Sequence, residues 1–159
     1  MPDNGRTTQN VALIEAPPPT VYRAFVDPDL VAQWLAPGEM TAEVHEFDAR
    51  EGGEIRISLH YPEGADQAGK STDTADMYRA RFVELVPDER VIQSIEFETD
   101  DPDFSGQMRM VVTLDPTRQG THVKIEFENI PEGISLEDNR LGTSLSLEKL
   151  SALIGRAVC

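Results

Sequence analysis

The apolar and polar positions near the start of the chain predict one strand and two short helices. Residues 10–15 form a largely apolar run, which three consecutive prolines at residues 17–19 bring to an end. Apolar residues at helical spacing follow in two groups. Thr20 is a candidate N-cap for the first group, and Asp27, with Pro28 at the first helical position, for the second. We therefore expect two consecutive helices directly after the first strand.

Between residues 41 and 128 the apolar period changes to two, which is typical of strands. The predicted strands are residues 41–48, 54–61, 76–86, 90–98, 107–114 and 121–128. In the clearest of them apolar residues alternate with charged ones, so that the strand has one apolar face and one charged face. This alternation indicates a curved antiparallel sheet with water on one side only.

The apolar side of that sheet needs a cover, and the segment 135–158 is the candidate. It carries leucines and isoleucines at helical spacing, among them Leu147, Leu150 and Ile154. At about 1.5 Å per residue, a helix of this length would cross the whole sheet. A strand, two short helices, a meander of strands and one long helix define an α+β fold.

The predicted strand 76–86 has two apolar sets in opposite phase. They are Tyr78, Ala80 and Phe82 on one face, and Val83 and Leu85 on the other. A bulge near Phe82 would let both sets point inward, and we favour this interpretation. Without a bulge, Arg79 or Arg81 would enter the interior and favour an anionic ligand.

Composition and charge argue against several classes of partner. The chain has 159 residues and a net charge of −15, from 14 Lys and Arg against 29 Asp and Glu. This balance argues against a nucleic-acid partner and against docking on an anionic membrane. No apolar run approaches the roughly 20 residues of a spanning helix, so membrane insertion is not expected. The acidity favours solubility, and adaptation to high salt is the alternative.

Length and end segments predict one domain in a reducing compartment. Residues 1–8 are polar and without periodicity, so we expect a disordered tail with no secretory signal, followed by a single domain over 9–159. The single cysteine, Cys159, cannot form an internal disulfide and favours a cytoplasmic location.

Four motifs combine aromatic, turn and core residues in a characteristic order. They are Val21-Tyr22-x-Ala24-Phe25-x-Asp27-Pro28-x-Leu30-x-x-x-Trp34, Phe47-Asp48-x-Arg50-x-Gly52-Gly53, Phe82-Val83-Glu84-Leu85-Val86-Pro87-x-Glu89-Arg90-Val91 and Gly120-Thr121-x-Val123. Together they resemble the family named for the activator of the heat-shock-protein-90 ATPase, within the START-like superfamily. The resemblance implies a helix-grip fold, in which a curved antiparallel sheet of six or seven strands wraps around a long C-terminal helix. One departure is Gly142-Thr143, where the family has Gly-Trp, which implies a wider cavity or compensation by another aromatic residue.

A helix held over a concave sheet tends to leave an apolar cavity with a few polar groups. The residues expected to line it are Trp34, Leu59, Tyr61, Tyr78, Gln93, Ile95, Met108, Met110, Phe127 and Leu147. The alternative is that these side chains form an ordinary filled core. Gln93 is the exception, because a buried amide needs hydrogen-bond partners and could orient a ligand or pair with a nearby tyrosine.

We expect neither a metal site nor a cofactor. Alternation places His60 and His122 on the solvated face, and no pair of histidines, His45 included, has the local spacing of metal ligands. No arrangement of serine or cysteine with histidine predicts a nucleophile, so no catalytic residue is assigned. The first hypothesis is a non-enzymatic domain that binds a small hydrophobic or amphipathic molecule between the sheet and the last helix. The alternatives are a cyclase or dehydratase that uses cavity tyrosines, and a co-chaperone-like interaction module.

Overall fold

The elements form in the order that the apolar pattern predicts. The computed structural model describes residues 5–36, 40–60, 75–97 and 106–154, without the side chains of 75, 76, 78 and 97. The strands within these ranges are β1 (Thr8–Ile14), β2 (Thr41–Phe47), β3 (Glu54–His60), β4 (Ala75–Val86), β5 (Arg90–Phe97), β6 (Met108–Thr117) and β7 (Gly120–Glu128). The helices are α1 (Pro18–Val26), α2 (Pro28–Trp34) and α3 (Leu136–Ile154).

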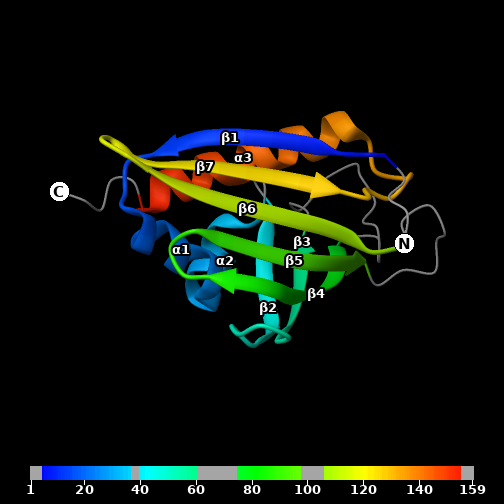
Figure 1. Ribbon diagram of the computed structural model, residues 1–159. Helices are drawn as coiled ribbons and strands as arrows, with labels where there is room; N and C mark the ends of the chain where they lie inside the picture. The colour runs from blue at the N-terminus through cyan, green and yellow to red at the C-terminus, as the bar shows by residue number, and fades with distance from the viewer. Residues whose placement is uncertain (1–4, 37–39, 61–74, 98–105, 155–159) are drawn as a thin grey trace.

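The seven described strands form one antiparallel sheet in the order β1-β7-β6-β5-β4-β3-β2. The sheet turns strongly from one edge to the other, so that β2 and β3 run steeply across the direction of β1 and β7 (Figure 1). α3 lies behind β1 and β7 in this view, and α1 and α2 close one end of the apolar face (Figure 1). The helix-grip architecture expected for an α+β chain is confirmed.

Two expectations for the N-terminal part are wrong. Thr20 is not an N-cap: α1 begins two residues earlier, at Pro18, and no side chain caps it. Prolines suit a first helical turn because its amide protons have no partner within the helix. Thr8, expected in a disordered tail, is the first residue of β1, and the preceding Arg6 exchanges backbone and side-chain hydrogen bonds with Ile130.

A bulge resolves the conflict of phase in β4. Its register with β5 shifts between Phe82 and Glu84, as the sequence predicts. Phe82 is fully buried and Leu85 packs against the core, whereas Val83 is 48% exposed. The expectation that Val83 also points inward is therefore wrong, since Val83 lies within the shifted register and stays on the outer side.

A second bulge lies in β2, between Val44 and Glu46. It allows Ala42, Val44 and Phe47 all to pack against the core, although strict alternation would turn Phe47 to the opposite side. Glu46 remains exposed on the outer face of the sheet. The bulge therefore adds Phe47 to the apolar wall under α3.

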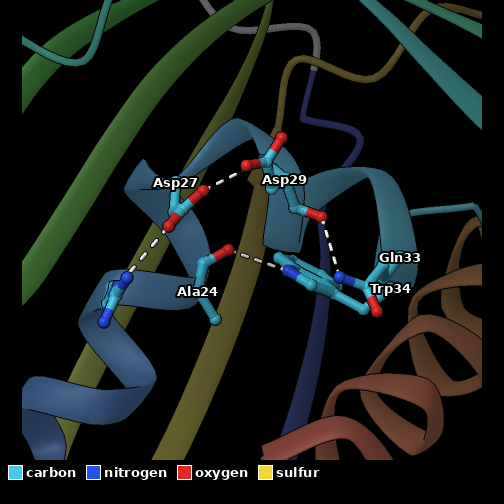
Figure 2. Close-up of polar contacts among 6 residues, drawn as sticks. Ala24, Asp27, Asp29, Gln33 and Trp34 are labelled. Atoms are coloured by element: carbon cyan, nitrogen blue, oxygen red, sulfur yellow. Dashed lines mark hydrogen bonds and ion pairs between the residues drawn. The ribbon is translucent and has the colours of Figure 1, made fainter.

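The corner between α1 and α2 fixes Trp34 (Figure 2). Asp27 caps α2 as predicted, its carboxylate accepting a hydrogen bond of 2.9 Å from the backbone N–H of Asp29. The indole N–H of Trp34 donates to the carbonyl oxygen of Ala24 at 2.8 Å, and its ring meets Phe25 edge to face with centroids 4.8 Å apart. This corner forms the closed end of the core.

Candidate ligand cavity

The N-terminal half of α3 presents small and polar side chains to the sheet. Asn139, Gly142, Thr143 and Ser146 follow the i, i+3, i+4, i+7 spacing of one helix face, and all four border the same cavity. Only farther along does the helix bury large apolar side chains, including Leu147 and those at 150 and 154. Because small side chains cannot reach the sheet, a space remains beneath the first half of the helix.

Polar contacts hold α3 on both flanks of this space. On the β1 side, the Asn10 amide donates to the Arg140 carbonyl oxygen at 3.0 Å, and the Thr8 hydroxyl donates to Asn139. On the α2 side, the Ser146 hydroxyl donates to the Leu35 carbonyl oxygen at 2.7 Å. These hydrogen bonds hold α3 in place on both sides of the cavity, while the space between the helix and the sheet stays unfilled.

Further contacts on the α2 side come from one lysine. The Lys149 ammonium donates to the backbone carbonyl oxygens of Ala36 and Met40, the latter at 3.2 Å. Its donors therefore serve the attachment of α3, and the ammonium is not among the groups that line the cavity.

The cavity measures about 450 Å³, room for about 15 water molecules at ~30 Å³ each. Its wall is mainly apolar, and the described residues that form it come from α1, α2, β2, β3, β5, β6, β7 and α3. Leu141 is 58% exposed and Asp138 is also exposed, so these two residues mark the opening on the α3 side. This size falls within the range of small-molecule sites in proteins.

Most of the predicted lining residues border this cavity. They are Trp34, Leu59, Gln93, Ile95, Met108, Met110 and Phe127. Leu147 does not; it is buried in the core cluster farther along α3. Tyr61 lies outside the described residues, and of Tyr78 only the backbone in β4 is described. The role of these residues in ligand binding stays a prediction.

The polar side chains of the lining differ in whether they have partners. Thr143 donates to the Asn139 carbonyl oxygen at 2.8 Å, while Ser146 and the Asn139 side chain carry the contacts that fasten α3. Gln93, on β5, is 8% exposed and lines the cavity, and its side chain forms no hydrogen bond to another residue in the part of the chain that the structure describes. The wall therefore contains one buried amide that faces the space.

The outer face of the sheet is lined with charge instead. Two rows of cross-strand partners run over it, Glu46-Arg56-Arg79-Glu96 and Glu54-Arg81-Ser94-Arg109-Glu128. Arg81 pairs with Glu54 at 3.2 Å and Arg109 with Glu128 at 3.8 Å. Arg79 and Arg81 therefore lie outside the cavity, as the bulge interpretation predicts.

The histidines lie on the outer side as well. His60 Nε2 is 3.5 Å from the Glu43 carboxylate, and His45 Nε2 is 2.7 Å from the Ser58 hydroxyl. His122 stands between two buried neighbours of β7 and points away from them. Among the described residues no three His, Cys, Asp or Glu side chains come together to hold a metal ion.

Several wall residues were not predicted from the sequence. They are Phe25, Val31, Leu35, Met40, Phe47, Ile55, Ile57, Ile125, Ile134, Asp138, Asn139, Leu141, Gly142, Thr143, Leu145 and Ser146. For the α3 residues a signal was available, since four small or polar side chains at helical spacing mark a face that cannot pack closely. For Phe47 no local signal exists, because its orientation depends on the bulge in β2.

The fold and the cavity define a START-like, helix-grip protein. Residues 15–155 match the family described as Activator of Hsp90 ATPase homolog 1-like protein, and the chain belongs to this family. A comparison with curated proteins finds no match. In the described part of the chain no helix combines the length and apolar character needed to span a bilayer.

Solved structures support this assignment. A crystal structure of a Chromobacterium violaceum protein shares 34% sequence identity with a TM-score of 0.83, covering 94% of this chain and 97% of that one. A Rhodobacter sphaeroides protein shares 19% identity with a TM-score of 0.76, over 100% and 97% of the two chains. An AHSA1-like protein from Aeromonas hydrophila shares 18% identity with a TM-score of 0.70, over 95% and 93%. The last two show likeness of fold alone.

Proposed function

We propose that this protein binds a small hydrophobic or amphipathic molecule in the space between the sheet and α3. The observation that carries the proposal is the apolar cavity of about 450 Å³ beneath the small-residue face of α3. An empty apolar space of this size forfeits contacts that a filled core would make, so a molecule of complementary shape would bind favourably.

The attachment of α3 supports the same proposal. Ser146 and Asn10 fasten the helix through hydrogen bonds at its two flanks, so its position does not depend on side chains filling the middle. A partly exposed opening at Leu141 gives a route of entry. Binding would therefore require little rearrangement of the sheet.

Titration with the neutral fluorescent probe N-phenyl-1-naphthylamine tests this function. We expect saturable binding with one molecule per chain, and stabilisation of the folded state by about 2.7 kcal/mol when the free probe is at a hundredfold excess over its Kd. Thermal denaturation with and without probe measures this shift.

A matched pair of variants on α3 locates the binding. Thr143→Trp would place a large ring in the cavity and should abolish probe binding while the fold is retained. Ser144→Trp puts the same ring on the exposed neighbouring position, which does not line the cavity, and should leave binding unchanged. Equal binding by the two variants, or no binding by the unsubstituted protein, would contradict the proposal.

The two alternatives stay predictions. An enzymatic role for Tyr61 and Tyr78 depends on side chains outside the described residues. A co-chaperone role is suggested by the family description. No observation on the described residues favours either over ligand binding.

A further inference from the structure

We propose that the ligand is an uncharged molecule with one hydrogen-bonding group, and that the Gln93 side chain receives this group inside the cavity. This inference rests on the proposed function and adds the chemical class of the ligand. It follows from three features of the wall: a buried amide that has no partner among the described residues, the absence of cationic groups among the described lining residues, and a carboxylate at the opening.

The first feature is the amide of Gln93. Its strand neighbours across the sheet are Phe82 and Met110, both buried and apolar. A buried amide surrounded by apolar side chains is unfavourable unless another polar group satisfies it. In the described part of the structure no side chain or backbone group forms a hydrogen bond with it, and the residue lines the cavity, from which the amide can be reached. A hydroxyl, carbonyl or amide group of a ligand would form the hydrogen bond that this amide needs.

The second feature is which polar groups remain available. The hydroxyl protons of Thr143 and Ser146 are donated to backbone carbonyl oxygens, and Asn139 Oδ1 accepts from Thr8, so each of these α3 side chains has a partner in the protein, whereas Gln93 has none among the described residues. Gln93 lies on the sheet, across the cavity from these α3 residues. The polar group of the ligand is therefore expected on the sheet side, with its apolar part toward Leu141 and the other apolar residues near the opening.

The third feature is charge. No Lys, Arg or His is among the described residues that line the cavity, and the ionisable side chain among them is Asp138, at the opening. A carboxylate or phosphate moved into this space would lose its hydration without gaining a cation. The net charge of −15 adds a repulsion of the same sign. Anionic amphiphiles such as fatty acids are therefore disfavoured, and a cation would lose its hydration in the same apolar interior.

Rigid probes of one shape test this class: naphthalene, 2-naphthol, 2-naphthoate and 2-naphthylmethylammonium, each competing with N-phenyl-1-naphthylamine. We expect 2-naphthol to bind about tenfold more tightly than naphthalene, as a neutral hydrogen bond allows. 2-Naphthoate should bind most weakly, and the ammonium probe more weakly than 2-naphthol. Equal binding of all four probes, or tighter binding of either ion, would overturn the inference while the proposed function stands. Failure of every probe, the fluorescent one included, would overturn both.

Variants at Gln93 test the assigned residue. Gln93→Met keeps the chain length but removes the amide, and should erase the preference for 2-naphthol over naphthalene, which is measured as the ratio of the two affinities in the same variant. Ser94→Ala, the next residue on the outer side of β5, should leave the preference intact. A preference that survives Gln93→Met would overturn the assignment. The selectivity of the unsubstituted protein is measured independently of whether the variant folds.

Two charge-reversal variants test the role of Asp138 at the opening of the cavity. Asp138→Lys and Glu137→Lys change the net charge equally, but Asp138 lines the cavity and Glu137 does not. Asp138→Lys should raise the affinity for 2-naphthoate several-fold relative to that for naphthalene, whereas Glu137→Lys should have a smaller effect on this ratio. Equal effects of the two variants would show that net charge alone disfavours anions and would overturn the role of Asp138.

Discussion

The indole N–H of Trp34 takes the place of an amide proton that the backbone of α1 lacks. In a regular helix the Ala24 carbonyl oxygen would accept from the amide of residue 28, but residue 28 is proline. Trp34 donates to this oxygen instead, at 2.8 Å and in a buried position. The last turn of α1 and the last residue of α2 are thereby joined (Figure 2).

Trp34→Phe tests this relationship. The substitution keeps an aromatic ring beside Phe25 but leaves the Ala24 carbonyl oxygen buried without its donor. We expect the free energy of unfolding to fall by about 1–3 kcal/mol, measured by urea denaturation. A change close to zero would mean that another donor, such as water, satisfies the oxygen.

Asp27→Ala should lower stability by about 1 kcal/mol, because it removes the N-cap of α2. Asp27→Asn is the matched control, since an asparagine still caps the helix but no longer forms the ion pair with Arg23. Thermal unfolding should place Asp27→Asn near the unsubstituted protein. If both variants lose the same stability, the ion pair rather than the cap is responsible.

Substitutions at two neighbouring residues of the β4 bulge should differ widely in their effect on the free energy of unfolding. Phe82→Ala removes a fully buried ring and is expected to cost about 3–5 kcal/mol. Val83→Thr changes a side chain on the outer face and should stay within about 0.5 kcal/mol. Chemical denaturation of both variants measures the contrast. Comparable losses would place Val83 in the core and contradict the bulge.

Thr121 joins β7 to the turn after β1. Its hydroxyl donates to the Ala16 carbonyl oxygen at 2.7 Å, and the residue is fully buried. Thr121→Val keeps the shape but leaves that oxygen unsatisfied, so we expect a loss of about 1–3 kcal/mol in the free energy of unfolding. Thr121→Ser retains the donor and loses only a methyl group, worth about 0.8 kcal/mol. A reversed order of the two variants in denaturation would refute the hydrogen bond.

The raised pKa of the Tyr22 phenol predicts that the protein loses stability at alkaline pH. Burial, with the nearby carboxylates of Asp88 and Glu51, raises the pKa of the Tyr22 phenol. The folded state therefore holds this proton more tightly than the unfolded state, whose tyrosine pKa is about 10. The resulting stabilisation is present below that pH and is lost as the pH rises through the higher pKa of the folded state.

Tyr22→Phe removes this contribution. The melting temperature of the variant should therefore fall less than that of the unsubstituted protein between about pH 9 and pH 11. Parallel curves for the two proteins would show that the titration of Tyr22 is not linked to folding.

Alternation along the strands was sufficient to predict the sheet, because one face of nearly every strand is apolar. The same rule was insufficient where the register shifts. The orientation of Phe47 follows from the bulge in β2, which no local pattern marks, and Val83 remains outside although it is apolar.

The cavity was harder to predict than the fold for a related reason. The leucines and isoleucines of the last helix were expected to cover the sheet, yet Leu141 is largely exposed while Gly142 and Thr143 line the cavity. Whether a helix packs closely or leaves a space depends on side-chain volume opposite the sheet. The side chains that face the sheet, and hence their volume, are known only once the orientation of the helix about its own axis is known.

The attachment of α3 to the segment after α2 gives the protein an internal optical reporter. Ser146 and Lys149 bond to backbone carbonyl oxygens at Leu35 and Ala36, directly after Trp34, which is the single tryptophan of the chain. A displacement of the helix would pull on this segment and alter the surroundings of the indole. Emission from Trp34 should therefore register the opening and filling of the interior without any added label.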